Sequence, residues 1–456
     1  MVFAVQKQPR DILHGPLLPN IISYTVPIIL TSVLQLLFNA ADLVIVGRFR
    51  GSASVGAVGA TTSLTMLIIN LFMGVSIGAG VCVAHAIGGK QEKTLHRLVH
   101  TAVPTALISG IVLTAVGITF CENFLLWMDT PAYLLPLSSL YMKVYFGGMT
   151  FTMVYNFCAA ILRAAGDTKS PLLFLTISGV INVILNVVFV TAFDMNVEGV
   201  ALATVISQAI SAVLVVMALR RRKDGCHLSL RKLHIYPSQL LRMLRIGLPA
   251  GIQSSLFAIS NVTIQSSINS FGDVVVAGNA AAANLDGFLY VILNSFSQTA
   301  MTFTGQHVGA GLSQRIKKIL WRCCICASVA GIIGGVLLYT FRQPLLSIYI
   351  TDSPEAIAYG SIRFVYIALP YFLCGLMDVV TGSLRGMGAA LAPMIISILG
   401  ACGLRIGWVL TVFRIPQFHT LEMLYFSYPI SWVITFAFQL LAFAIFYRRM
   451  QKNSVT

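Results

Sequence analysis

Residues 17–46 read LLPNIISYTVPIILTSVLQLLFNAADLVIV, and Asp42 is the single charged side chain among them. A helix needs about 20 apolar residues to cross the hydrocarbon core of a bilayer, so this stretch is long enough to span one. Its apolar character is continuous and does not alternate from residue to residue, which favours a helix over a strand of a membrane barrel. The stretch therefore predicts a first transmembrane helix.

Eleven further apolar runs follow in a chain of 456 residues that is 57% hydrophobic and 10% charged. Soluble domains are roughly 45–50% apolar and 25% charged, so a water-soluble fold is excluded. The sequence predicts an all-α polytopic membrane protein with twelve transmembrane helices. The predicted spans are 17–46, 55–84, 97–120, 134–158, 170–192, 198–218, 245–270, 275–304, 319–341, 357–384, 390–412 and 422–447.

The basic residues predict the orientation of these helices. The net charge is +15, and 23 of the 30 Lys and Arg residues fall in the two tails and the even-numbered connections. By the positive-inside rule, both termini are expected in the cytoplasm, so the charge indicates a bilayer and no nucleic-acid partner. The opposite loops are assigned five basic residues, which are Arg48, Arg50, Arg342, Arg363 and Arg414.

The chain also contains an internal duplication. A shift of 222 residues superimposes the two halves without a gap, and it aligns Pro27 with Pro249, Asn39 with Asn261, Leu162-Arg163 with Leu384-Arg385, and Pro171 with Pro393. Copies with an even number of crossings share one orientation, so they are related by a pseudo-two-fold axis along the membrane normal, as in many carriers. We expect six-helix lobes at 1–219 and 245–456, joined by a basic cytoplasmic linker at 220–244 that orients the chain or binds lipid.

Several functions are excluded by missing motifs. The stretch from Ala84 to Gln91 lacks the first glycine and the final Ser or Thr of a phosphate-binding loop, so ATP is not the expected energy source. No Ser/His/Asp set or metal-ligand cluster suggests catalysis. The sequence thus predicts a protein that is not an enzyme, has no cofactor and is driven by an ion gradient.

Asp42 is the leading candidate for ion coupling, because an acid within a bilayer is costly unless it is paired, protonated or hydrated. Its duplicated partner is Ile264, so the charge belongs to one half only. The alternative is an interfacial Asp that bonds to Arg48 or to water.

Polar residues on the fifth and sixth spans could complete a site with Asp42. Asn182 and Asn186 share a helix face at i, i+4 spacing, and Val200 and Thr204 lie just across a short loop. Amide, hydroxyl, carbonyl and carboxylate oxygens suit Na+, and the same groups suit a hydrogen-bonded proton. Helix packing through hydrogen bonds remains the alternative.

The second half contains two further acids, Asp286 and Asp378, and a buried Arg405. We expect Asp378 to pair with Arg405 for structural reasons, which leaves Asp286 as the freer acid. Asp286 would then either face the central cavity as a cation-binding residue or serve as a hydrogen-bonding residue within the second lobe. Pro27 and Pro249 each remove a helix hydrogen bond, so helix bends are predicted there.

These features together resemble the multidrug and toxic compound extrusion (MATE) family. The resemblance covers nearly the whole chain and rests on Pro27, on the run from Asp42 to Gly47, and on the Leu-Arg motifs after spans four and ten. It implies an antiporter that expels amphipathic, often cationic, compounds in exchange for Na+ or H+. Matched by position, the ion site would comprise Asp42, Asn182, Asn186, Thr204 and the Val200 carbonyl.

One departure concerns the seventh span, where some members carry an acid and this chain has Gln253, Phe257 and Asn261. The resemblance therefore does not extend to ion binding of that type. The candidates for the substrate cavity are Asp286, Asp378, Gln253, Asn261 and Asn156.

The resulting hypothesis is a monomeric antiporter of the bacterial cytoplasmic membrane that exports organic cations by rocking two lobes around a central cavity. The nearest rival is a lipid or lipid-linked oligosaccharide flippase of related architecture, which we expect to have a more cationic cavity. A receptor or scaffold is disfavoured by the duplication.

Overall fold

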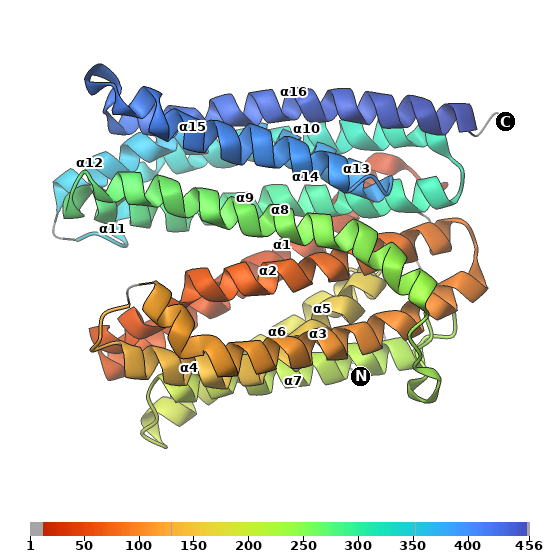
Figure 1. Ribbon diagram of the computed structural model, residues 1–456, viewed down its shortest axis with the longest axis horizontal. Coiled ribbons are helices and arrows are strands. Elements are labelled where there is room, and N and C mark those ends of the chain that lie inside the picture. The colour runs from red at the N-terminus through yellow and green to blue at the C-terminus, as the bar shows by residue number, and fades with distance from the viewer. Residues whose placement is uncertain (1–11, 129, 352, 454–456) are drawn as a thin grey trace. The chain divides into compact units, whose positions relative to one another are not determined.

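The structure is a computed structural model that describes residues 12–128, 130–351 and 353–453 (Figure 1). Within these ranges the regular elements are all helices. The first half contains α1 (Leu17–Arg50), α2 (Ser52–Gly88), α3 (Glu92–Trp127), α4 (Leu135–Gly147), α5 (Met149–Ala164), α6 (Lys169–Thr191), α7 (Val197–Arg221) and the 3₁₀ turn η1 (Leu230–Lys232). The second half contains α8 (Pro237–Asn269), α9 (Asp273–Gly309), α10 (Ser313–Thr340), α11 (Arg342–Ser347), α12 (Pro354–Arg363), η2 (Phe364–Ala368), α13 (Tyr371–Gly386), α14 (Leu391–Ser397), η3 (Ile398–Gly403), α15 (Leu404–Leu410), η4 (Val412–Arg414), η5 (Pro416–Phe418) and α16 (Leu421–Asn453).

Each predicted apolar run falls on one helix or one broken helix, so the all-α prediction is confirmed. Nine described helices are long and apolar enough to cross a membrane, and two bent helix pairs raise that number to 11. The remaining long segment is α8, which has 33 residues and a more polar composition. Counting α8, the described chain accounts for the twelve predicted spans.

The two bent spans break where the backbone cannot continue a regular helix. α4 and α5 meet at an angle of 47°, at the pair Gly147-Gly148. The segment Pro354–Ala368 meets α13 at 42°, next to Pro370. Glycine pairs and proline are the usual causes of sharp kinks, so the sequence itself explains both breaks.

The chain divides into two compact units, and both boundaries fall inside a helix. The first unit contains Val26–Gly251, and the second contains Leu13–Thr25 together with the chain from Ile252 onward. The boundaries lie within one helical turn of Pro27 and Pro249, although α1 and α8 are helical through these prolines. The bends predicted at the two prolines stay predictions.

The first unit has a close helix contact made of glycine. A Cβ atom on Gly74 would lie 2.3 Å from the backbone nitrogen of Gly251, and one on Gly78 would lie 2.2 Å from the carbonyl oxygen of Met243. α2 and the start of α8 therefore touch through their backbones. Small residues permit such contacts between membrane helices, where dispersion and not the hydrophobic effect drives association.

The duplicated contact in the second unit is polar. The start of α1 packs against α9 through Thr25 and Thr299, whose hydroxyl oxygens are 2.8 Å apart, and Tyr24 meets Phe303 edge to face at 5.3 Å between ring centroids. The equivalent helix contacts thus differ: α2 and α8 meet through backbone atoms in the first unit, and α1 and α9 meet through a hydrogen bond in the second.

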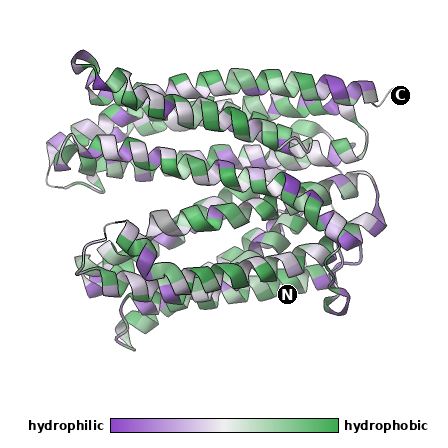
Figure 2. Ribbon diagram, in the orientation of Figure 1, coloured by the Kyte–Doolittle hydropathy of each residue, from purple (hydrophilic) through white to green (hydrophobic). Residues whose placement is uncertain are grey.

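The helix surfaces are suited to lipid. Hydrophobic residues cover the helices along their length, and hydrophilic residues gather at helix ends and connections (Figure 2). In the most apolar window of α1, 17% of the residues are buried in the protein. An outward-facing apolar surface of this extent is costly in water, and a bilayer removes the cost.

Candidate functional site

Asp42 lies on α1 and contacts α6 and α7. The side-chain nitrogen Nδ2 of Asn186 donates to Oδ1 of Asp42 at 2.5 Å. The hydroxyl of Thr204 lies 3.4 Å from the other carboxylate oxygen, Oδ2. Asp42 is half-buried, whereas Asn186 is fully buried. The carboxylate is therefore held between two helices by uncharged groups.

The remaining predicted site residues join the same cluster. Asn186 also donates to Oδ1 of Asn182 at 3.3 Å, and Nδ2 of Asn182 lies 3.4 Å from the Thr204 hydroxyl. That hydroxyl lies 3.0 Å from the carbonyl oxygen of Val200, one turn earlier on α7. The structure thus brings together all five residues that the sequence proposed for ion binding.

The cluster, named the Asp42 cluster below, has more acceptors than donors. The hydroxyl of Thr204 has a single hydrogen and is closer to the Val200 carbonyl than to Asp42. The amide oxygen Oδ1 of Asn186 is buried and has no hydrogen-bond partner among the described residues. A buried acceptor without a donor costs about 1–3 kcal/mol, so a proton or a cation would relieve this cluster.

Gly179, which the sequence analysis did not identify, permits α1 to approach α6. A Cβ on Gly179 would lie 1.8 Å from Cε2 of Phe38, so the ring rests directly against the glycine and an added side chain would displace it. Phe38 precedes Asp42 by four residues, and Gly179 precedes Asn182 by three and Asn186 by seven. The contact and the Asp42 cluster therefore share one helix face. In the sequence, a glycine one helical turn before the pair of Asn182 and Asn186 was the signal that could have identified this helix contact.

α6 and α7 are joined next to this contact by a second group that sequence reasoning missed. The hydroxyl of Ser211 donates to that of Ser178 at 2.6 Å, and both residues are buried. The bond fixes the two helices that supply Asn182, Asn186 and Thr204, so it supports the spacing of the site.

The second unit holds a different carboxylate arrangement. Nε of Arg363 donates to Oδ2 of Asp286 at 2.7 Å, and Nη1 of Arg363 donates to Oδ1 of Asn279 at 2.9 Å. The hydroxyl of Tyr425 donates to the same Asn279 oxygen at 2.8 Å. The expectation that Asp286 is the freer acid was wrong, because its charge is balanced by Arg363. Arg363, assigned to a loop from sequence, ends α12 with 11% of its side chain exposed.

The predicted pair of Asp378 and Arg405 was also wrong. Nε of Arg405 donates to the hydroxyl of Ser431 at 2.9 Å, and its guanidinium carbon lies 4.2 Å from the ring centroid of Tyr428 and 5.7 Å from that of Trp432. Aromatic faces attract a desolvated guanidinium, so the direct contacts of Arg405 are with a hydroxyl and two rings, and no ion pair joins it to Asp378 in the described chain. Oδ2 of Asp378 is buried and has no hydrogen-bond partner in the described chain.

The other proposed cavity residues have separate surroundings. Gln253 is buried, donates to Ser397 at 2.9 Å and accepts from Arg385 at 2.8 Å. Asn156 donates to the carbonyl of Thr152 on its own helix, in the first unit. Asn261 is exposed on α8. Their roles in substrate binding stay predictions.

Comparison with known proteins agrees with this architecture. The model of the MatE family matches residues 27–188 and 249–409, one segment in each duplicated half. "Probable multidrug resistance protein YoeA" of Bacillus subtilis is 28% identical over 425 residues, which cover 90% of each chain. An "FAD transporter" of Shewanella oneidensis is 22% identical over 399 residues, 86% of this chain and 87% of that protein.

A solved structure shows the same fold. The structure described as an outward-facing conformation of a multidrug resistance MATE family transporter matches with a TM-score of 0.90 at 19% identity, over 98% of this chain and 99% of that one. The family model itself covers more than half of the chain. The chain therefore belongs to the MatE family of multidrug and toxic compound extrusion transporters, which are multi-pass membrane transporters and not enzymes.

Proposed function

We propose that this transporter is a secondary antiporter that exports amphipathic organic cations across the bacterial cytoplasmic membrane in exchange for Na+ or H+. The observation that carries the proposal is the Asp42 cluster, in which, among the described residues, the carboxylate has only neutral hydrogen-bond partners and the adjacent Asn186 oxygen has no donor. A bound cation would supply the missing positive charge, and a proton would supply the missing hydrogen-bond donor.

The residues fit both candidate ions. The carboxylate of Asp42, the amide oxygens of Asn182 and Asn186, the Thr204 hydroxyl and the Val200 carbonyl are hard oxygen ligands of the kind that Na+ accepts. A proton on Asp42 would instead turn one carboxylate oxygen into a donor. Either ion neutralises the acid, and the Na+ and H+ versions differ only in which gradient drives export.

Coupling requires that the ion bind the two transport states unequally, because a ligand with equal affinity for both shifts no equilibrium. We propose that neutralising Asp42 favours a conformation of α1 bent at Pro27, which alters the first lobe's part of the substrate cavity. Two lobes that rock around this cavity would then expose it to each side in turn.

The proposed topology follows from the basic residues. Both termini and the polar segment between α7 and α8 would lie in the cytoplasm, and the transporter would act as a monomer. Reporter fusions at the C-terminus that are active only in the cytoplasm test the orientation, and fusions active in the periplasm would contradict it.

The direct test of function is efflux of a fluorescent organic cation from proteoliposomes under separately imposed Na+ and H+ gradients. We expect one of the two gradients to drive efflux. Asp42→Asn should abolish the coupling of efflux to that gradient, and Thr204→Ser should retain the coupling because the hydroxyl remains. An Asp42→Asn protein that still couples efflux to either gradient would contradict the proposed site.

A second candidate, export of an organic anion or a lipid-linked anionic substrate, would use Arg385, which donates to Gln253 and interacts with the charge of Asp378 while its Nε atom is buried without a hydrogen-bond partner among the described residues. A relative described as an FAD transporter gives this candidate a precedent. Loading the same vesicles with an organic anion or with a lipid-linked substrate separates the candidates.

A further inference from the structure

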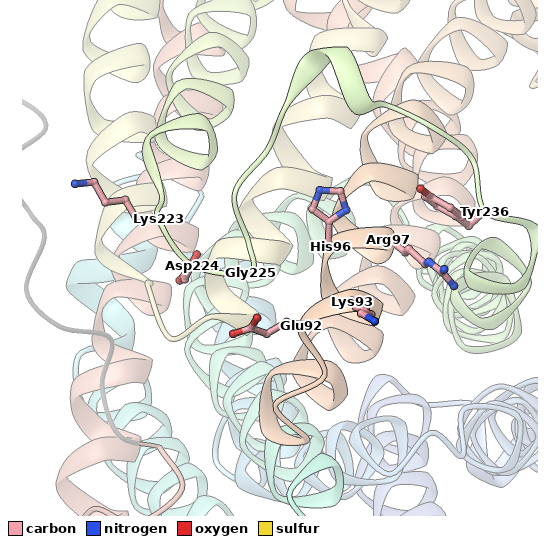
Figure 3. Close-up of a pocket in the computed structure, with 8 residues that line it drawn as sticks. All are labelled: Glu92, Lys93, His96, Arg97, Lys223, Asp224, Gly225 and Tyr236. Carbon is pink, nitrogen blue, oxygen red and sulfur yellow. The ribbon is translucent and has the colours of Figure 1, made fainter.

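A cavity of about 500 Å³ opens in the first unit, between the start of α3 and the segment 222–236 that follows α7 (Figure 3). Lys93 and Arg97 lie with Tyr236 on one side of His96, and Lys223 and Asp224 lie on the other (Figure 3). None of these residues belongs to the Asp42 cluster. The cavity, called the linker cavity below, therefore needs its own explanation.

The walls of the linker cavity are fixed by hydrogen bonds. The backbone N–H of Ser229 donates to Nε2 of His100 at 3.1 Å, and that of Tyr236 donates to the hydroxyl of Thr101 at 3.2 Å. Cys226 and Leu228 anchor the same segment because their side chains are buried. The segment is thus held against α3, and the cavity is formed before any ligand arrives, which lowers the entropic cost of binding.

The charges around the linker cavity favour an anion. No ion pair in the described ranges joins Lys93, Arg97 or Lys223 to an acid. Asp224 is neutralised by Arg222, whose Nε donates to Oδ1 at 2.9 Å. Burial acts to raise the pKa of Asp224, but the hydrogen bonds and the charge of Arg222 outweigh it and hold this pKa below its usual value. Glu92 is then the one lining acid not engaged by an arginine, against three cations.

The start of α3 adds to this preference. α3 begins at Glu92 without a side-chain cap, and the free N–H groups of a helix start carry partial positive charge, which the Glu92 carboxylate in the first turn offsets in part. Uncapped helix starts next to basic side chains are a common setting for phosphate groups.

The duplicated position in the second unit shows what such a cation can bind. Lys93 corresponds to Arg315, whose guanidinium donates to the carbonyl oxygens of Leu13 and Gly15, at 2.9 Å for the latter. There the chain itself supplies oxygen ligands. In the first unit no comparable backbone oxygen is bonded to Lys93 among the described residues, so this position is available to an external oxygen ligand.

We propose that the linker cavity binds a phosphate group, supplied by an anionic phospholipid headgroup or by a soluble phosphate ester. Lys93, Arg97 and Lys223 would contact the phosphate oxygens, and Tyr236 would hold Arg97, whose guanidinium carbon lies 5.4 Å from the ring centroid. Basic pockets at the cytoplasmic ends of membrane helices bind lipid headgroups in this way. Binding at this cavity does not depend on which ion drives transport.

The test compares ligands on the purified, delipidated full-length protein in detergent. The change in thermal unfolding temperature is followed while phosphatidylglycerol, phosphatidylcholine or glycerol 3-phosphate is added. We expect phosphatidylglycerol to raise the unfolding temperature at lower concentration than phosphatidylcholine. Each cation removed should weaken the response about fivefold, so Lys93→Gln/Arg97→Gln/Lys223→Gln should weaken it roughly a hundredfold.

A matched control separates the site from general charge. Lys317→Gln/Lys318→Gln/Arg449→Gln removes three exposed cations that lie outside the cavity. This protein should respond like the wild type, and the charge-preserving Lys93→Arg should as well. Equal weakening in the two triple variants would overturn the proposal, as would an equal response to phosphatidylcholine. A response to glycerol 3-phosphate that the cavity variant loses would assign the phosphate to a soluble ester.

Discussion

Asp42 in the first half and Asp286 in the second half are neutralised differently, and a third enclosed acid, Asp378, also lies in the second half. In the first unit, Asp42 has Asn186 and Thr204 as partners, neither of which is charged. In the second unit, Asp286 is paired with the guanidinium of Arg363 at 2.7 Å. A carboxylate without a fixed positive partner can bind and release a proton or a cation. A carboxylate paired with an enclosed arginine is already neutralised and has no need of either. We infer that Asp42 serves transport and Asp286 serves stability.

The duplication sharpens this comparison, because each cluster is absent from the other half. Adding 222 to Asp42, Asn182 and Thr204 gives Ile264, Leu404 and Phe426, which are all apolar. Subtracting 222 from Arg363 and Asn279 gives Tyr141 and Ala57. The two duplicated halves thus share one helical framework, but each carries a polar cluster that the other half lacks.

The largest effect is expected from breaking the second unit's ion pair. Asp286→Asn leaves the largely buried Arg363 charge unpaired, which should lower the free energy of unfolding by about 3–5 kcal/mol. The double variant Asp286→Asn/Arg363→Met removes both charges and should recover most of this loss. Denaturant-induced unfolding in detergent measures both changes.

Asp42→Asn is the matched control for this prediction. Its partners are neutral, so the substitution should change the free energy of unfolding far less. A loss as large as that of Asp286→Asn would mean that the two carboxylates have the same structural role.

A smaller loss is expected at the glycine contact of the first unit. A Cβ on Gly78 would lie 2.2 Å from the Met243 carbonyl, and backbone atoms cannot move aside as a side chain can. Gly78→Ala should therefore lower the free energy of unfolding by about 1–3 kcal/mol. A Cβ on Gly59, on the same helix, would meet no atom of the described residues within 4 Å, so Gly59→Ala should be neutral or stabilising. Equal losses in the two variants would contradict the contact.

The contact of Gly179 with Phe38 should change ion affinity more than stability. Gly179→Ala must move either the Phe38 ring or α1 itself, and a shift of α1 would separate Asp42 from Asn186 and raise the ion concentration for half-maximal efflux on the order of tenfold. Phe38→Ala removes the clashing ring, so the double variant should regain affinity. Transport rate against ion concentration provides the measurement, and failure of the double variant to recover would show that Gly179 does not set this distance.

The smallest effect concerns the hydrogen bond between Thr25 and Thr299. Thr299→Val removes a bond of a kind that averages about 0.6 kcal/mol between membrane helices, and Thr299→Ser retains it. Unfolding of the two variants should therefore differ by about that amount. Identical unfolding would show that the contact is held by packing alone.

The fold could be predicted closely because its signals are local. Long apolar runs indicate the helices, whereas the bends at Gly147-Gly148 and next to Pro370 were not among the predicted ones. The Asp42 cluster could also be proposed, since Asn182 and Asn186 share a face and a repeated frame carries an unrepeated charge. Both features can be recognised from periodicity and spacing.

The partners of the second-unit charges could not be predicted, because they depend on packing between distant segments. Arg363 lies 77 residues from Asp286 and near a helix end, so it resembled a loop residue. Arg405 is stabilised by aromatic faces, which leave no charge pattern in the sequence. Gly179 acts through a neighbour on another helix, and no local signal reveals that neighbour.

The most direct test of the central claim is equilibrium ion binding to the purified transporter, with radioactive Na+ and with a pH titration of intrinsic fluorescence. The wild type and Asp286→Asn/Arg363→Met should bind one and the same ion with similar affinity, and Asp42→Asn should not bind it. Unchanged binding by Asp42→Asn, or loss of binding only in the Asp286 and Arg363 variant, would contradict the assignment of ion coupling to the first unit.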